Sequence, residues 1–580
     1  MAGIKLVAFT GEQPRILPRL LPDTAAQAAV NTRLDDGGLT PMRTSTLEAA
    51  IGGSTFKTIY KHLGAWLKWN TEVHAAPGPV ATDRLYYTGD GKPKMRVGGA
   101  VYDLAVPRPA VALTATLGGA GAGDVVTRSY VYTWVTSFGE ESEPCPASNE
   151  IAWKPGNTVT LSAFAATPGG RSITHQRIYR TQTGQSGTWF YLIAERAASA
   201  ADFADTIPVD GFQEPLPSAF WNAPPDDLKG LISLPNGMMA AFAGSDLYFC
   251  EPWRPHAWPE KYSLGMSSPI VALGAIGTSV VVMTTGNPHL VSGSHPSTMQ
   301  AAKMEANLPC INSRGVADLG FAIAYPSNEG LVAAKADGSI GIVSANLFDR
   351  DDWLALKPST IIAGQIGGRY VAFYENVNDA GDLVGGALFL DIGPTPFLIR
   401  SSERAQAVAY EIETGALYFL RKSENNVYRL DAPNGVRQKQ YWRSKPFVLT
   451  APINFGAIQV DADMELSGHE KAINAAALAE IEAANAAILA TGEAMGEVND
   501  TPLNAFALNG DLLTLLPEFG GNLNIGIYAD GKLVAQIDRT NKPIRLPSGF
   551  KARKWEIDVY GDVQIEQIIV ATTMDELKSA

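Results

Sequence analysis

A weak repeat of apolar strand pairs in the middle of the chain constrains its fold more than any other feature. Successive members of the repeat begin near Gly230, Ile270, Gly315, Ile361 and Ala407. Each member joins an apolar strand to an amphipathic strand through a turn that contains Gly or Asn. A spacing of about forty to fifty residues is typical of the blades of a β-propeller. We therefore expect propeller blades over residues 221–440. Because no residue signature repeats strictly, unrelated β-meanders of similar length are the alternative.

The length and composition of the chain indicate several β-rich domains. A chain of 580 residues exceeds one ordinary hydrophobic core, and about three to five domains are expected. Charged residues make up 18% and hydrophobic residues 46%, with 56 Gly and 37 Pro. This balance is typical of a turn-rich globular β-protein and excludes a disordered or fibrous chain.

Residues 1–106 are expected to form an N-terminal arm followed by a first β-unit, part of a platform or of the propeller. The arm alternates proline-pinned extended chain with a short Ala-rich helix that begins after an N-cap at Asp23 or Thr24. Alternating strands are expected over residues 58–69 and 83–104, with Gly89-Asp90-Gly91 as a hairpin turn.

Residues 107–220 read as a separate β-sandwich inserted before the blades. Pro107-Arg108-Pro109 provides a stiff entry into this module. Short strands at regular spacing are expected over residues 128–146, 157–164, 173–182, 188–195 and 201–206. A sandwich similar to a fibronectin type III domain fits this pattern best.

Residues 441–580 read as a C-terminal β-domain, a platform or tip, that is interrupted by one helix. The segment from about 469 to 495 is Ala-rich, and its apolar residues recur every three to four positions, which is typical of a helix. Strands resume over residues 522–538, 544–550, 554–561 and 563–572, and Asp530-Gly531 is expected to form another hairpin turn. The apolar stripe is narrow and interrupts a β-domain, so we expect a contact element for a neighbour rather than core. Its candidate contact residues are Ile473, Ile481 and Ile488.

No catalytic constellation can be assembled from the sequence. A GxSxG elbow, a P-loop, an HExxH helix and a CxxC pair are all absent, and the seven His are scattered singly. Asp349, Asp351 and Asp352 could in principle supply an acid–base pair, but a solvated turn that caps a short helix is the preferred interpretation. We therefore expect a protein that is not an enzyme and has no catalytic residue.

Metal and cofactor binding are not expected either. The best metal candidates are His256 and Glu260, beside the run CEPWRPHAWP at residues 250–259. Three prolines and two tryptophans in that run favour a rigid loop packed across the edge of a blade. The three cysteines are widely spaced and odd in number, which allows no full disulfide framework and no zinc knuckle. Folding in a reducing cytoplasm is the natural interpretation.

Charge and hydropathy limit the partners of the chain. The net charge of −13 argues against a protein that grips nucleic acid over its surface, because phosphate neutralisation needs concentrated Lys and Arg. The first residues lack the basic and apolar regions of a signal peptide, and no stretch approaches the roughly eighteen apolar residues of a membrane span. We expect neither export by that route nor a membrane span.

Several segments resemble a family of phage structural proteins. They are, in order, PRILPRLLPDTAAQAAVN, YVYTWVTSFGEESEP with HQRIYRTQTG, GLISLPNGMMAAFAG, EPWRPHAWPEKY, WRSKPF and RLPSGFKARKWEIDVYG. Together they are similar to the tail tubular B, or nozzle, proteins of short-tailed bacteriophages, over nearly the whole chain outside the helix. Within the sandwich, the recurring residues are Tyr130 to Thr133, Gly139 to Ser142 and Arg177 to Arg180. Each of these, taken singly, also suits any sandwich.

The resemblance implies a structural virion protein, assembled in the host cytoplasm, that forms a hexameric nozzle ring below the adaptor ring of a short tail. Its partners would be further copies of itself, the tail adaptor protein, tail fibres, and DNA that passes through the channel without specific binding. The family supplies no catalytic residue, and the helix departs from its pattern. The alternative is a propeller-type tail protein that binds or hydrolyses glycans.

If DNA passes through a channel in the assembly, the passage of DNA favours one sign of charge on the channel wall. Lys and Arg would hold phosphates and stall ejection, whereas an acidic wall would repel them. The net charge favours an acidic lumen, although acidity that only keeps a large protein soluble is an equal alternative. The candidate lumen-facing residues, all in expected blade turns, are Asp246, Glu329, Asp337 and Glu413.

Overall fold

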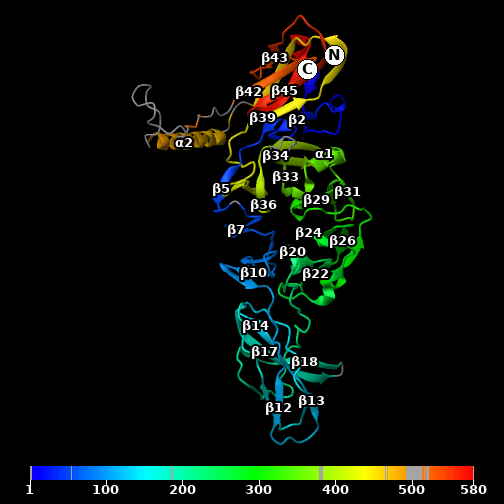
Figure 1. Cartoon of the computed structure of the whole chain (residues 1–580), viewed down its shortest axis with the longest axis vertical. Helices are drawn as coiled ribbons and strands as arrows, with labels where there is room; N and C mark the ends of the chain where they lie inside the picture. Colours follow the sequence, from blue (N-terminus) through cyan, green and yellow to red (C-terminus); the bar gives the residue numbers. More distant parts are fainter. Residues whose placement is uncertain are drawn as a thin grey trace. The chain divides into compact units, whose positions relative to one another are not determined.

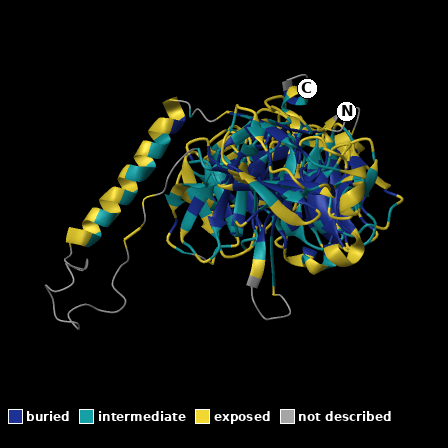
Figure 2. Ribbon diagram, turned by 90° about the horizontal axis from the view of Figure 1, so that it is seen from above, coloured by how far each residue is buried: buried dark blue, intermediate teal, exposed yellow. Residues whose placement is uncertain are grey.

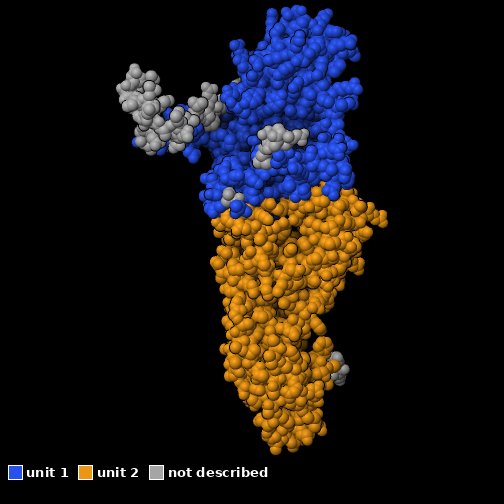
Figure 3. All heavy atoms as spheres, viewed as in Figure 1, with its two compact units in different colours: residues 1–55, 328–331, 342–580 blue, residues 56–327, 332–341 orange. Residues whose placement is uncertain are grey.

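The described part of the chain is mainly β. The computed structural model describes residues 3–578 except 54, 185–186, 378–382, 464–465, 467, 491–512, 515 and 517–520. These residues form 46 strands and three α-helices (Figure 1). They belong to two compact units (Figure 3): unit 1 comprises residues 1–55, 328–331 and 342–580, and unit 2 comprises residues 56–327 and 332–341. The expected predominance of β-structure is confirmed.

Unit 2 contains three four-stranded antiparallel sheets, each made of consecutive strands. The first joins β8 (His74–Pro77), β9 (Arg84–Thr88), β10 (Lys94–Val97) and β11 (Ala100–Asp103). The second joins β20 (Lys229–Ser233), β21 (Met239–Ala243), β22 (Asp246–Phe249) and β23 (Leu264–Gly265). The third joins β24 (Ile270–Ile276), β25 (Ser279–Thr284), β26 (His289–Ser292) and β27 (Gln300–Lys303). The hairpin expected at Gly89-Asp90-Gly91 is confirmed, because β9 and β10 pair antiparallel across it.

The inner strands of these sheets are buried on both faces. In β25, the four residues from Val280 to Met283 are all inaccessible to solvent. Successive side chains of a strand point to opposite faces, so this run needs packing partners on both sides of its sheet. On one side, Val280 and Val282 share a core with Leu273 of the paired strand β24 and with Phe249 of β22, which belongs to the preceding sheet.

Residues 114–205 of unit 2 form two three-stranded sheets and a short strand pair. One sheet joins β12 (Thr114–Gly118), β16 (Thr158–Ser162) and β19 (Phe203–Asp205). The other joins β14 (Tyr130–Thr136), β17 (Ile173–Gly184) and β18 (Gly187–Ala197), and β13 (Val126–Arg128) pairs with β15 (Ile151–Trp153). Every residue of β14 is buried, and Tyr132 and Trp134 lie in one aromatic core with Phe164. The strands expected in this region are confirmed.

Unit 1 is organised around one large sheet. Its strand order is β32 (Ile362–Ile366), β33 (Arg369–Val377), β34 (Leu383–Asp391), β35 (Phe397–Ser401), β2 (Ala26–Val30), β39 (Gln440–Ser444), β45 (Ala552–Gly561), β42 (Leu523–Ala529) and β43 (Lys532–Ile537). In addition, β40 (Phe447–Ile453) pairs with β45. The β42–β43 hairpin expected at Asp530-Gly531 is confirmed. Both turn residues have positive φ, +48° and +81°, as the tight turn of a two-residue hairpin requires.

The short helix expected after Asp23 is wrong, because residues 26–30 form strand β2 instead. This strand lies between β35, which is parallel to it, and β39, which is antiparallel. Ala26 and Ala29 are almost completely buried there. The helix propensity of a few alanines is a weak preference, and the hydrogen bonds and burial offered by two neighbouring strands override it.

Two smaller sheets join the start of the chain to distant strands of unit 1. In one, β1 (Ile4–Leu6) pairs with β46 (Gln564–Ala571), followed by β41 (Ala457–Asp463) and β44 (Ile544–Arg545). In the other, β36 (Ala405–Glu411), β37 (Ala416–Arg421) and β38 (Asn426–Arg429) are completed by β5 (Thr46–Ala50). Residues 3–53 therefore belong with the C-terminal half, whereas the sequence had grouped them with residues up to 106.

Three α-helices are described, all in unit 1. The six-residue α1 (Arg350–Ala355) has Asp349 as its N-cap, whose carboxylate accepts a hydrogen bond from the Asp352 amide, so the capping interpretation is confirmed. The helix expected within the C-terminal domain is α2 (Gly468–Ala490), and the remainder of its expected range, 491–495, lies outside the described residues. The third, α3 (Met574–Lys578), packs beside β46.

Candidate functional site

Helix α2 is fixed to unit 1 at its first turn by a buried ion cluster. The Glu470 side chain is only 6% exposed. Its Oε1 accepts hydrogen bonds from Arg43 Nη2 and Arg437 Nε, each at 2.8 Å, and its Oε2 accepts one from Arg437 Nη2 at 3.1 Å. Charge-assisted hydrogen bonds of this kind are stronger and more directional than neutral ones. The start of the helix is therefore held in one orientation.

Beyond this anchor the helix is largely exposed, although Asn485 donates a hydrogen bond to the Thr514 oxygen at 2.7 Å and accepts one from the Thr514 amide at 2.8 Å. From Lys471 to Ala490 every residue is at least partly exposed, although most of the side chains are Ala, Ile or Leu. Figure 2 draws α2 beside the body, with only exposed and partly exposed colours after its first turn. The three expected contact residues, Ile473, Ile481 and Ile488, are all partly exposed. An apolar helix normally buries its side chains against other parts of a protein. The side chains of α2 after Glu470 remain exposed or partly exposed instead.

By length and composition alone, α2 is also apolar enough to cross a membrane. None of its most apolar 18-residue window is buried inside the molecule. This stretch was not expected from the sequence. Alanine is only mildly apolar, and the Ile and Leu residues that raise the mean hydropathy of the segment are scattered among the alanines.

The four acidic residues expected to face a lumen are all exposed. Asp246 is the first residue of β22, Glu329 lies in the turn after β29 (Ile323–Ser327), and Asp337 and Glu413 lie in turns. Hydrogen bonds from Ser339 lower the pKa of Asp337. Among the described residues, only Glu329 of these four forms an ion pair, with Arg350 at 3.1 Å. The other three keep an uncompensated negative charge at the surface.

Unit 2 contains a buried carboxylate pair, Glu140 and Glu141, in the turn after β14. One oxygen of Glu141 accepts hydrogen bonds from Thr133 Oγ1 and Tyr179 Oη, each at 2.7 Å, and the other accepts one from Arg177 Nη1 at 2.9 Å. The Glu140 carboxylate accepts a hydrogen bond from Arg171 Nη2 at 2.6 Å. Sequence reasoning had named most of these residues as recurring ones but could not assign them a role. The structure brings them together as a buried ionic junction.

The junction also fixes His256, the residue first considered for metal binding. His256 is 2% exposed, and its Nε2 lies 3.1 Å from the backbone oxygen of Glu141, to which it donates. Burial, aided by the positive charge of Arg171, lowers the pKa of His256 to about 3, so the ring is neutral. Glu260 is exposed on a separate 3₁₀ turn. Within the described ranges, no three His, Cys, Asp or Glu side chains are grouped to hold a metal ion.

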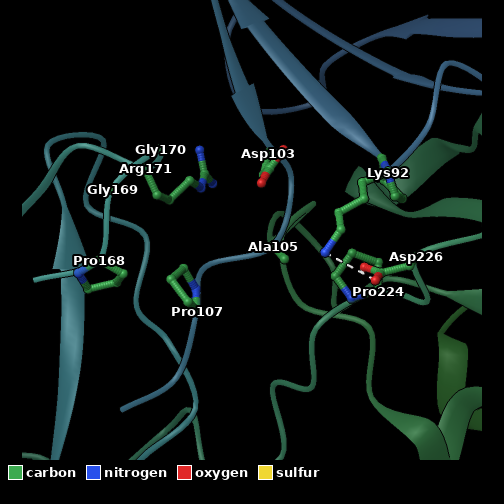
Figure 4. A pocket seen from close by; sticks show the side chains of 11 residues that line it. Lys92, Asp103, Ala105, Pro107, Pro168, Gly169, Gly170, Arg171, Pro224 and Asp226 are labelled. Atoms are coloured by element: carbon green, nitrogen blue, oxygen red, sulfur yellow. Dashed lines mark ion pairs between the residues drawn. The ribbon is translucent and has the colours of Figure 1, made fainter. Parts of the chain in front are cut away.

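A small pocket adjoins the junction. It has a volume of about 220 Å³. Figure 4 shows Arg171 on one side of it and the Lys92–Asp226 ion pair, with a 3.1 Å separation, on the other. Much of the remaining wall is proline and glycine, namely Pro93, Pro107, Pro168, Gly169, Gly170 and Pro224. No Ser, Cys or His lines it, so the pocket offers cationic and carboxylate groups but no hydroxyl, thiol or imidazole.

The cysteines offer no reactive thiol. Cys145, Cys250 and Cys310 are all buried and unpaired. Burial raises the pKa of Cys145 to about 11 and the pKa values of Cys250 and Cys310 to about 12. A thiol that stays protonated at neutral pH is a poor nucleophile and a poor metal ligand.

No family model and no curated protein matches the chain. Among solved structures, the N-terminal domain of Nup159 aligns at 8% identity and a TM-score of 0.22, over 43% of this chain and 86% of its own. The extracellular domain of a hybrid two-component system from B. thetaiotaomicron aligns at 9% identity and a TM-score of 0.23, over 71% of this chain. This chain spans 44% of the length of that domain. Similarities at these scores carry no argument about fold details or function.

Proposed function

We propose that this protein is a structural subunit of a short bacteriophage tail, and that several copies form the nozzle ring through which DNA leaves the virion. The observation that carries the proposal is helix α2, which is anchored at Glu470 and whose Ala, Ile and Leu side chains after Lys471 are all at least partly exposed. A monomer gains nothing from holding an apolar helix in water, whereas a subunit of an assembly gains a contact. The resemblance of the sequence to nozzle proteins supports the same role.

The proposed fold places the four-stranded sheets in a β-propeller. The first strands of four such sheets are β20, β24, β28 (Ala317–Asp318) and β36, and β32 begins a further run of four strands, β32 to β35, within the large sheet. These five strands begin 41 to 47 residues apart, the spacing of propeller blades. The N-terminal strand β5 completes the sheet of β36 to β38, and a strand from the far end of a chain often closes a propeller in this way. We further propose that residues 107–220 are a fibronectin III-like insert, supported by their two facing three-stranded sheets.

In this role the partners are six copies of the chain, the tail adaptor protein and tail fibres. DNA passes without specific binding, and the protein acts structurally rather than as an enzyme. A conduit needs head-to-tail contacts whose rotation closes into a ring, which is the property of heterologous interfaces. The exposed acidic turns are compatible with a wall that repels phosphate.

Native mass spectrometry of the purified chain and of tails from virions tests the proposal. A closed ring, with six copies as the expected stoichiometry, supports it. Monomers or dimers alone in both samples would contradict it. A glycan array run on the same protein separates the alternative, because strong glycan binding without ring formation indicates a carbohydrate-directed tail protein.

A further inference from the structure

Unit 1 carries a concentrated run of positive charge in an otherwise acidic protein. Residues 532–554 contain seven Lys and Arg and a single acidic residue, Asp538, although the whole chain has a net charge of −13. All seven basic side chains belong to exposed residues: Lys532, Arg539, Lys542, Arg545, Lys551, Arg553 and Lys554. We call this set the basic edge.

Part of the basic edge follows the corner between β40 and β41. Arg545 lies opposite Ala457 of β41, and Lys554 lies opposite Val448 of β40. The Arg553 guanidinium donates to the backbone oxygen of Thr450. Their three partners lie within residues 448–457, which lead from β40 of the large sheet into β41 of a four-stranded sheet, so the three basic residues flank one short segment of the chain.

Most of the positive charge of the basic edge has no acidic partner, and exposed apolar side chains lie beside it. Lys532, Lys542, Arg545 and Lys551 form no ion pair with any residue that the structure describes. Val448 is 62% exposed and Leu533 is 48% exposed beside these charges. A partner that offers carboxylates together with apolar side chains would complement this surface.

Helix α2 presents that combination. After Lys471 its only charged residues are Glu480 and Glu482, both exposed, and neither is in an ion pair within the described ranges. Around them the side chains are apolar, and Leu489 is 52% exposed. The helix is therefore an apolar rod with two negative charges near its middle.

We propose that α2 of one subunit packs against the basic edge of the next subunit. This inference rests on the proposed ring and names one contact within it. The contact is heterologous, because helix and edge are different surfaces of the same chain, and repetition of such a contact closes a ring. It is electrostatically complementary, which favours a defined partner and orientation over other apolar associations.

A membrane is a weaker candidate for covering α2. Glu480 and Glu482 lie in the central part of the helix, where carboxylates are costly in hydrocarbon. Against the basic edge the same two groups gain charge-assisted hydrogen bonds. The charges that oppose a lipid environment are those that favour the neighbouring subunit.

The area of the helix face indicates how much of a subunit interface this contact can supply. A helix of 23 residues is about 35 Å long and about 10 Å across, so one face covers about 350 Å². A standard interface buries about 800 Å² on each partner. Helix α2 therefore supplies part of a subunit interface, and loss of this contact weakens the ring without removing every other contact.

Cysteine crosslinking tests the pairing directly. Leu489→Cys and Val448→Cys are made in separate full-length chains, whose native cysteines are buried and do not compete. Disulfide-linked dimers are expected when the two chains are coexpressed and oxidised. Ile412→Cys, at a residue 84% exposed, replaces Val448→Cys as the matched control and should give none. Crosslinks of the Leu489→Cys chain to itself, or crosslinks equal to the control, overturn the proposal.

Charge reversal tests the electrostatic part. Glu480→Lys with Glu482→Lys should raise the concentration needed for half-maximal assembly about tenfold, which equals about 1.4 kcal/mol. Adding Lys551→Glu and Arg553→Glu to that chain should restore most of the loss. Glu150→Lys with Glu305→Lys makes the same change in net charge at exposed sites in unit 2 and should have little effect.

The outcomes separate this inference from the proposed function. A native ring without the specific crosslink keeps the nozzle and refutes the contact. Monomers without crosslinks refute both. The last experiment adds vesicles of anionic lipid to the protein. If α2 inserts into the vesicles and becomes protected from protease, and no crosslink forms, the helix binds a membrane and the subunit contact is refuted.

Discussion

The buried ionic junction of unit 2 gives the sharpest test of the packing. Arg177 contacts two carboxylates: Glu141 at 2.9 Å, with a side chain 3% exposed, and Glu195 at 2.7 Å, with a side chain 42% exposed. Glu141→Gln keeps the shape of the side chain but removes its charge. We expect this variant to lose much more stability than Glu195→Gln, although both break an ion pair with the same arginine.

The magnitude follows from burial. Removing one partner of a buried pair costs about 3–5 kcal/mol, and because Arg177 is itself 29% exposed we take about 2–3 kcal/mol for Glu141→Gln. An exposed pair contributes about 0.2–1 kcal/mol, which is the expectation for Glu195→Gln. At about 2–4 °C per kcal/mol for a unit of this size, the expected falls in Tm are about 4–12 °C for Glu141→Gln and about 0.4–4 °C for Glu195→Gln.

Differential scanning calorimetry of the full chain measures both falls. The Glu141→Gln change should move one transition, that of unit 2, and leave the other in place. Equal shifts for the two variants would refute the argument from burial, as would a shift below about 1 °C for Glu141→Gln.

Three further predictions concern pH, the helix and DNA. The pKa of His256 is about 3 in the folded protein and near 6.5 in the unfolded chain. The contribution of His256 to the free energy of unfolding is therefore complete above pH 6.5 and falls by up to about 1.4 kcal/mol per pH unit as the pH drops towards 3. His256→Asn should flatten this part of a plot of Tm against pH, and an unchanged slope would show that other groups cause it. Deleting residues 468–490 should leave the strands folded, with a sharp thermal transition and a reduced helical signal in circular dichroism; loss of soluble protein would instead make α2 integral to the fold. The purified ring should bind duplex DNA weakly even at low salt, and tight binding with a steep salt dependence in a gel-shift assay would disprove an acidic conduit.

Local chemistry explains the parts of the fold that the sequence predicts. The β42–β43 hairpin was predictable because Asp530-Gly531 suits the turn and the flanking residues alternate. The Asp349 cap was predictable for the same reason, since a short polar side chain before a helix satisfies its free amides. Signals of this kind lie within a few residues of the feature that they specify.

Features that depend on distant partners could not be predicted in this way. Ala26 and Ala29 indicate a helix until β35 and β39 are known to lie on either side of them. Glu470 resembles any acidic residue of a helix, because the arginines that bury it come from positions 43 and 437. His256 was singled out for its chemistry, but its low pKa and its hydrogen bond to Glu141 arise only when its loop packs against the turn that carries Glu141.

The pairing of β1, β2 and β5 with strands late in the sequence limits the order in which the parts of the protein can fold during synthesis. Strand β1 waits for β46, whose residues are synthesised about 560 positions later, and β2 and β5 also wait for strands beyond residue 395. At about 5–20 residues per second, the wait of β1 lasts about half a minute to two minutes. Unit 2 can fold on the ribosome during that time, while the N-terminal strands expose unpaired backbone edges. Chaperone occupancy should therefore concentrate on residues 4–50 and end once β46 has been synthesised.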